Sequence, residues 1–233
     1  MLELFPQGFE EVERADGVEL VAYTDASGEE RLWEAFGGAS GADVGEGWED
    51  GWRRFHRPVR VGRIWVGPPW EEPDADALAV VIDPGRAFGT GAHPTTRLCL
   101  ELLQELEPTS VVDAGCGSGV LAVAAAKLGF APVHAVDNEQ AAVEATRSNA
   151  AANGVEVAAR WVDVLTEELP EAGLTLANIL LDAVERLALR IRSPLFVASG
   201  YLVADQPRLP SGWHRVDRRA SDGWAADLFA RTP

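Results

Sequence analysis

The chain has 233 residues, 47% of them hydrophobic and 24% charged, which suits one α/β domain with a small addition and excludes a disordered or fibrous chain. Its formal net charge of −17 argues against a nucleic-acid backbone as ligand and suits a basic protein substrate, although an acidic surface can also serve solubility alone. No apolar run approaches the roughly 20 residues of a membrane span, and two cysteines form neither a disulfide framework nor a zinc pattern, so we expect a cytoplasmic protein without metal or membrane contact.

Residues 1–45 are rich in glycine and acidic residues, and we expect them to form a small β-containing module that faces the substrate. Val18–Thr24 alternates loosely between apolar and polar side chains, which predicts a strand. Arg31–Phe36 follows a turn and is interpreted as its partner in a hairpin.

Residues 46–77 are interpreted as a linker of one helix and one strand. Trp48–Phe55 places aromatic side chains at helical spacing, and Val59–Val66 is a candidate strand that ends before two prolines. The main domain is expected over residues 78–233, and it begins with a short apolar strand at Leu78–Ile82.

The segment Asp83–Thr96 holds three glycines and two prolines and is too irregular for a helix or a strand. Pro94 can occupy the first turn of the helix that we predict at Thr95–Leu106. His93 lies just before this helix, and we interpret it as part of the loop's structure in preference to a proton-transfer group.

Beyond this helix, strands and helices alternate, which predicts an α/β domain with a doubly wound, mostly parallel sheet and right-handed crossovers. The predicted strands are 110–113, 133–137, 155–161, 174–178 and 195–203, and the predicted helices are 118–129, 139–153 and 182–191. At the end of the chain, Trp213–Arg219 and Trp224–Ala230 predict an antiparallel hairpin at a sheet edge.

The most informative motif is Val111–Gly119, which reads Val-Val-Asp-Ala-Gly-Cys-Gly-Ser-Gly, with Asp137 eighteen residues beyond it. A strand that ends in an acid, a glycine turn that opens a helix, and a second strand that ends in an acid form a βαβ unit for a nucleoside-bearing cofactor. The third glycine comes one place too early for the dinucleotide pattern Gly-x-Gly-x-x-Gly, so a nicotinamide oxidoreductase is disfavoured. Cys116, inside the loop, is interpreted as a packing residue.

The acids of this motif favour S-adenosylmethionine, which carries an ammonium group, a sulfonium group and a ribose diol but no phosphate. Asp113 precedes the glycine loop, where a carboxylate suits a cationic ligand better than a diphosphate. Gly115 and Gly117 let the backbone approach the cofactor. Asp137 ends the second strand and is placed to accept hydrogen bonds from both ribose hydroxyls.

Two further polar residues follow strands whose carboxyl ends meet at the same edge of the sheet. Asp163 is a candidate acceptor for the adenine amino group, or else a solvated loop acid beside Glu167 and Glu168. Asn178 ends a buried strand and is the candidate catalytic residue, because its side-chain oxygen can hold a substrate amine with its lone pair toward a methyl group. The alternative for Asn178 is a turn-forming residue before a helix.

The residues also resemble a known family. Ile82–Arg97 looks like the signature loop of the ribosomal-protein methyltransferases called PrmA, which trimethylate lysine side chains and the N-terminal amine of a large-subunit ribosomal protein. The resemblance continues through Val112–Ala122, Ala135–Asn138, Ala177–Leu180 and, in the linker, Trp48–Trp70. It therefore covers about residues 48–205.

This resemblance implies a Rossmann-like class I methyltransferase fold, with S-adenosylmethionine bound by residues 78–233. It implies cofactor contacts at Thr96, Gly115, Asp137 and Asn178. It also implies a lid over the methionine end of the cofactor, formed by Phe88, Gly89 and Thr90 together with Gly91.

The sequence departs from the family in its N-terminal part. The family carries a ferredoxin-like domain that binds the ribosomal protein, whereas residues 1–45 are too short and too glycine-rich for all of it. We therefore expect a methyltransferase for lysine or N-terminal amines, with a large-subunit ribosomal protein as the first-choice substrate. Another protein or a small amine as substrate, and a non-catalytic module that binds S-adenosylmethionine, are the alternatives.

Overall fold

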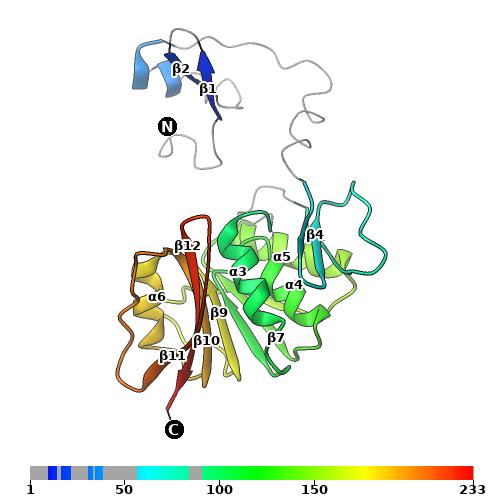
Figure 1. Cartoon of the computed structure of the whole chain (residues 1–233), viewed down its shortest axis with the longest axis vertical. Coiled ribbons are helices and arrows are strands. Elements are labelled where there is room, and N and C mark those ends of the chain that lie inside the picture. Colours follow the sequence, from blue (N-terminus) through cyan, green and yellow to red (C-terminus); the bar gives the residue numbers. More distant parts are fainter. Residues whose placement is uncertain are drawn as a thin grey trace. The chain divides into compact units, whose positions relative to one another are not determined.

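The structure is a computed structural model, and it describes residues 10–14, 17–21, 31–33, 35–38, 57–83 and 91–232. The chain divides into two compact units, Met1–Trp52 and Arg53–Pro233 (Figure 1). The predicted helix at Trp48–Phe55 lies outside the described residues.

The first unit contains a two-stranded antiparallel sheet. Strand β1 (Glu10–Arg14) pairs with β2 (Gly17–Val21), so that Glu10 lies opposite Val21. The prediction that Arg31–Phe36 is the partner strand was wrong, because β1 takes this place and residues 31–33 and 35–36 are helical. Only two residues separate β1 and β2 in the sequence, which favours a hairpin, whereas leucine, arginine and alanine in the later segment favour a helix.

The second unit begins with a small three-stranded sheet. Strand β3 (Val59–Val61) pairs antiparallel with β4 (Ile64–Gly67), and β4 pairs parallel with β5 (Leu78–Val81). The prediction of one continuous strand over Val59–Val66 was wrong, because Gly62, with a φ of 55°, turns the chain back. A residue without Cβ adopts this left-handed conformation freely, so the chain reverses there.

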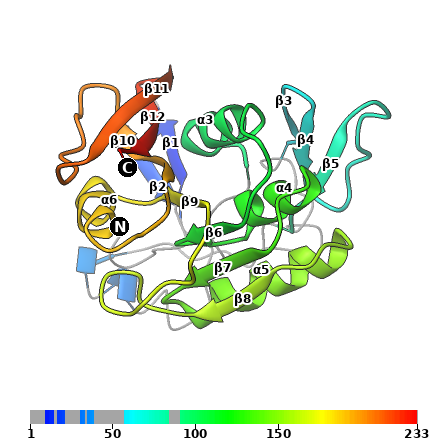
Figure 2. The same cartoon turned by 90° about the horizontal axis from the view of Figure 1, so that it is seen from below.

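The main sheet has seven strands in the order β11-β12-β10-β9-β6-β7-β8 (Figure 2). Five neighbouring strands are parallel, and in the last hairpin β12 pairs antiparallel with both β10 and β11, which confirms the predicted doubly wound sheet with an antiparallel hairpin at its edge. The strands are β6 (Val111–Ala114), β7 (Val133–Asp137), β8 (Ala158–Trp161), β9 (Leu174–Asn178), β10 (Leu195–Leu202), β11 (Trp213–Ser221) and β12 (Trp224–Arg231).

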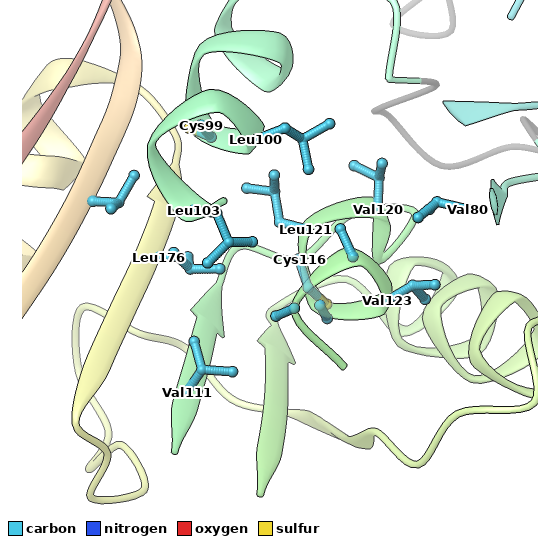
Figure 3. Packing of buried hydrophobic residues seen from close by; sticks show 14 of the residues in the cluster. Val80, Cys99, Leu100, Leu103, Val111, Cys116, Val120, Leu121, Val123 and Leu176 are labelled. Atoms are coloured by element: carbon cyan, nitrogen blue, oxygen red, sulfur yellow. The ribbon is translucent and has the colours of Figure 1, made fainter. Parts of the chain in front are cut away.

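Helices cover both faces of this sheet. Helices α3 (Pro94–Leu103), α4 (Val120–Lys127) and α5 (Gln140–Ala152) contribute to one apolar core, and α6 (Leu181–Ala188) contributes to the core on the opposite face. Figure 3 shows the first core, in which side chains of α3 and α4 pack against those of β6 and β9. Within the part of the chain that the structure describes, no helix is long and apolar enough to cross a membrane.

Candidate functional site

The candidate site lies at the carboxyl ends of the parallel strands, where doubly wound sheets bind their ligands. The loop between β6 and α4 carries Gly115, Gly117 and Gly119, with φ angles of 78°, 53° and 82°. All three lie in the left-handed region, which side chains with a Cβ rarely adopt. The glycine triplet is therefore needed for the shape of the loop.

Two of these glycines also allow close approach by other segments. A Cβ on Gly115 would lie 2.5 Å from Cγ2 of Ile179, which follows β9. A Cβ on Gly119 would lie 2.8 Å from the side chain of Thr146 and 3.0 Å from its Cα, on α5. The loop is thus packed between the end of β9 and helix α5, and a methyl group at either glycine would displace one of them.

Asp137 ends β7 directly beside this loop. Its Oδ2 accepts a hydrogen bond from the backbone N–H of Gly117 at 2.9 Å, and its Oδ1 accepts one from the N–H of Glu139 at 3.0 Å. The side chain remains partly exposed. Each carboxylate oxygen keeps a further lone pair, so the group can accept additional hydrogen bonds from a diol.

Asp113, the other acid of the motif, is 1% exposed. Its Oδ2 accepts a hydrogen bond from the N–H of Ala122 at 3.1 Å and so links the end of β6 to the first turns of α4. Burial raises the pKa of this carboxyl to about 7, with a further contribution from the nearby charge of Asp137 and an opposing one from the Ala122 N–H. The direct attraction of a ligand's ammonium group to Asp113 stays a prediction.

Asn178 and Thr96 are brought together from positions far apart in the sequence. Nδ2 of Asn178, at the end of β9, donates a hydrogen bond of 3.2 Å to Oγ1 of Thr96, in the first turn of α3. Thr96 is buried, and Asn178 is partly exposed. With Nδ2 engaged in this way, Oδ1 is the atom of the amide that remains to accept a hydrogen bond from a ligand.

The first turn of α3 is itself held in place by His93 and by the C-terminal hairpin. Nδ1 of His93 accepts a hydrogen bond from the N–H of Thr95 and caps the helix, which agrees with our interpretation of this residue as structural. The imidazole contacts the ring of Trp224 edge to face, with the two ring centroids 4.9 Å apart. Burial lowers the His93 pKa, and the charge of Arg97 lowers it further.

Asp163 lies after β8 and is engaged by its own turn. Its Oδ1 accepts from the N–H of Leu165 at 2.9 Å and its Oδ2 from the hydroxyl of Thr166 at 2.8 Å. These two bonds hold the pKa of the carboxyl below its usual range. These contacts favour the interpretation of Asp163 as an acid that stabilises its own loop, and contact with an adenine amino group stays a prediction.

The remaining predicted residues fall into two groups. Phe88, Gly89 and Thr90 lie outside the described residues. Cys116 is buried, its Sγ accepts a hydrogen bond from the hydroxyl of Thr146, and burial raises the pKa of its thiol, so it remains protonated and packs as predicted. Among the residues that the structure describes, no three metal-binding side chains lie close enough together to hold an ion.

The sequence reasoning missed Asn149, which lies on α5 and is buried. Its Nδ2 donates to the carbonyl oxygen of Ser118, in the glycine loop, at 2.8 Å, and its Oδ1 accepts from the N–H of Asp83 at 3.0 Å. One amide therefore links the glycine loop to Asp83, two residues after β5. An asparagine between apolar helix positions, four residues before Asn153, is the signal that could have identified it.

Comparison with known proteins supplies a family. Residues 24–224 match the family described as "Ribosomal protein L11 methyltransferase (PrmA)". A "Ribosomal protein L11 methyltransferase" of Symbiobacterium thermophilum is 42% identical over 198 residues, which cover 78% of this chain and 65% of that protein. One from Caldanaerobacter subterraneus subsp. tengcongensis is 37% identical over 229 residues, which cover 87% of this chain and 73% of that protein.

A solved structure agrees with the sequence relatives. The crystal structure of ribosomal protein L11 methylase from Lactobacillus delbrueckii subsp. bulgaricus has a TM-score of 0.66 with this chain at 26% sequence identity, and the match covers 76% of this chain and all of that one. The chain spans between 50% and 73% of the length of the first curated relatives that it matches.

Proposed function

Because the chain belongs to the ribosomal protein L11 methyltransferase family, we propose that it transfers methyl groups from S-adenosylmethionine to lysine or N-terminal amines of ribosomal protein L11. The observation that carries the proposal is the contact of Asn178 with Thr96 at the strand ends where Asp137 meets Gly117. Three segments remote in sequence thus converge on one edge of the sheet, as a site for a cofactor and a substrate requires.

The described residues suit S-adenosylmethionine better than a dinucleotide. The N–H of Gly117, which a pyrophosphate would need at a loop of this kind, already donates to the carboxylate of Asp137. The lone pairs that Asp137 keeps are matched to the two hydroxyls of a ribose. We therefore assign Asp137 to the ribose, and Thr96 and Gly115 to the walls of the same site.

The cofactor supplies a methyl group on a positively charged sulfur, so the protein has to align an amine with it and exclude competing water. In our proposal, Oδ1 of Asn178 accepts a hydrogen from the substrate amine and directs the nitrogen lone pair toward the methyl group. The bond to Thr96 holds the amide in the orientation that presents this oxygen. A lysine ammonium must lose a proton first, and desolvation in the site lowers its pKa from the usual value of about 10.4.

The charge of the chain supports a basic partner. A formal net charge of −17 attracts a basic ribosomal protein over long range and opposes direct contact with nucleic acid. We place the reaction in the cytoplasm, where the two buried free thiols, Cys99 and Cys116, are in a reducing environment. Another basic protein or a small amine would use the same site.

The experiment is an intact-mass measurement of purified L11 after incubation with the full chain and S-adenosylmethionine. We expect mass increments of whole methyl groups on L11, and calorimetric binding of S-adenosylmethionine without binding of NAD. Methylation of other proteins or of small amines in place of L11 would change the substrate and keep the chemistry. Tight binding of NAD, or S-adenosylmethionine binding without methylation of any amine tested, would overturn the proposal.

A further inference from the structure

A bulge in β10 lies next to the segment that carries Asn178. The pairing of β10 with β12 shifts by one residue between Ser199 and Tyr201, and Gly200 between them has a φ of 103°. Ser199 lies opposite Asn178 in the parallel pairing of β10 with β9. A bulge inserts one residue into a strand and redirects the backbone that follows. The redirection here occurs at the end of the strand nearest to the candidate site.

Gly200 is in direct contact with the backbone of Ile179. A Cβ on Gly200 would lie 2.1 Å from the carbonyl oxygen of Ile179 and 2.7 Å from its carbonyl carbon, so only glycine allows this approach. On the other side, the N–H of Ile179 donates to the carbonyl oxygen of Ser199 at 3.1 Å. Because Ile179 follows Asn178 directly, the bulge determines where the backbone of Asn178 lies.

The bulge is held by a buried polar pair. The hydroxyl of Tyr201 lies 2.8 Å from Oδ2 of Asp227 on β12 and 2.9 Å from the carbonyl oxygen of Ala198, and its one hydrogen can be donated to either. It thus spans the bulge from residue 201 back to residue 198. The Ser199 hydroxyl adds a second link, because it donates to the carbonyl oxygen of Ala225 at 2.7 Å.

Asp227 is fully buried, and its surroundings are costly for a carboxyl group. Arg215 and Arg218 approach it at 3.6 Å and 3.5 Å, too far for good hydrogen bonds, and Oδ1 of Asp227 has no hydrogen-bond partner in the described part of the chain. Apolar side chains of similar size would fill this space at a lower cost. An apolar side chain could not accept the hydrogen bond from Tyr201, and this bond is what the carboxyl group of Asp227 supplies.

We propose that Tyr201 and Asp227 are positioning residues, which act through the Gly200 bulge to hold Asn178 where it can orient the substrate amine. The inference rests on the proposed methyl transfer, but it concerns residues that contact neither cofactor nor substrate. The path runs from the Tyr201–Asp227 hydrogen bond to the bulge, from the bulge to the backbone of Ile179, and from there to Asn178. Removal of the hydrogen bond should therefore impair turnover and leave cofactor binding intact.

The kinetic test compares Tyr201→Phe with a matched control, Thr175→Val, in the full chain with L11 as substrate. Thr175 is buried at the other end of β9, and its hydroxyl shares a hydrogen bond with the hydroxyl of Ser193. We expect Tyr201→Phe to lower kcat about tenfold, with the Kd of S-adenosylmethionine changed less than about twofold, and Thr175→Val to leave both unchanged. Equal kcat in the two variants, or a parallel loss of kcat and cofactor affinity in Tyr201→Phe, would overturn the inference.

A second variant tests whether both partners act through one bond. We expect Asp227→Leu, which removes the acceptor, to lower kcat as Tyr201→Phe does, and the double variant to be no slower than the more impaired single variant. Multiplication of the two losses would show that the residues act separately and would contradict the inference. If Asp227→Leu does not fold, Tyr201→Phe, which removes one oxygen atom, carries the test alone.

Hydrogen exchange provides a readout that needs no enzymatic activity. In Tyr201→Phe we expect the amide of Ile179 to exchange at least about tenfold faster, because its acceptor, Ser199, belongs to the bulge, while the amide of Gly117 is unchanged. Unchanged exchange at Ile179 would refute the inference even in an active enzyme. If Ile179 exchanges faster in Tyr201→Phe but the unsubstituted chain methylates no amine, the proposed function is refuted and the structural link between the bulge and Ile179 stands.

Discussion

The glycine loop and Asn178 lie at neighbouring strand ends, but contacts of different range hold them in place. Gly117 bonds to Asp137, 20 residues away, within one βαβ unit. Asn178 bonds to Thr96, 82 residues away, and the helix that carries Thr96 is linked to the C-terminal hairpin through an ion pair that spans 125 residues. The cofactor half of the site is therefore built locally, whereas the half assigned to the substrate depends on remote parts of the chain.

This difference predicts how substitutions spread. A change at Asp137 should mainly affect the ligand that binds there, because the hydrogen bonds of its side chain stay within one βαβ unit and its helix. A change in the remote half should reach Asn178 from α3, β10 or the hairpin, since each of them contributes to its position. The following predictions test this contrast.

The largest effect is expected for Gly115→Ala, at the point where the two halves touch. The left-handed φ costs about 1–2 kcal/mol for alanine, and the contact with Cγ2 of Ile179 adds about 1–3 kcal/mol. We expect the free energy of unfolding, measured with urea, to fall by about 2–5 kcal/mol. In Ile179→Ala the clash with Cγ2 is absent, so adding Gly115→Ala to that variant should cost only the part due to φ. A loss as large as in the unsubstituted chain would show that the two halves are not packed against each other there.

The next effect concerns the pH dependence of stability. Burial raises the pKa of Asp113 to about 7 from its usual value of 3.8, so between these pH values the native state retains a proton that the unfolded chain releases. This contribution to stability is present below about pH 4 and is lost as the pH rises to about 7, by at most about 4 kcal/mol. Asp113→Asn should not show this loss of stability between about pH 4 and 7. Identical slopes of unfolding free energy against pH in the two proteins would contradict the prediction.

Asp137→Ala should weaken cofactor binding alone. We expect the affinity for S-adenosylmethionine, measured by calorimetry, to fall by about 1–3 kcal/mol, the range for loss of a polar partner in a site. Glu139→Ala is the control, because it removes an exposed acid from the same turn and keeps the backbone N–H that bonds to Asp137. Unchanged affinity in Asp137→Ala would mean that the ribose binds elsewhere.

Asn178→Ala should show the opposite pattern. We expect turnover to fall by about tenfold or more, which corresponds to at least about 1.4 kcal/mol in the barrier, and cofactor affinity to fall less. Steady-state kinetics on L11 together with calorimetry separates the two quantities. Equal losses of both would make Asn178 a cofactor-binding residue and would remove the division between the two halves.

The smallest effect is expected for the ion pair between Arg97, on α3, and Asp222, in the hairpin turn. The atoms lie 2.6 Å apart, but the side chains are 34% and 62% exposed, and exposed pairs contribute about 0.2–1 kcal/mol. A double-mutant cycle with Arg97→Ala and Asp222→Ala should give a coupling energy in this range that declines with salt. A coupling above about 2 kcal/mol would show that the hairpin dominates the position of α3.

Prediction from sequence succeeded where short-range patterns determine the structure. Strand β7 and the alternation of strands and helices from residue 94 onward follow from apolar periodicity and from glycine and proline at the ends of elements. It failed at Val59–Val66 and at Arg31–Phe36. In the first, one glycine reverses an otherwise strand-like run; in the second, a segment nearer in the sequence, β1, pairs with β2.

For the site, the residues that could be named in advance are those whose backbone conformation or strand position requires them, as with Gly115, Gly117 and Asp137. The hydrogen bond between Gly117 and Asp137 lies within one βαβ unit, so the order of the residues alone implies that these two meet. Asn149, Tyr201 and Asp227 could not be named in this way, because a buried polar side chain acquires its meaning from the partner that folding brings to it. That Asn178 donates to Thr96, and that a bulge in β10 lies against Ile179, depends on which strands become neighbours in the sheet, and this order is a property of the folded chain as a whole.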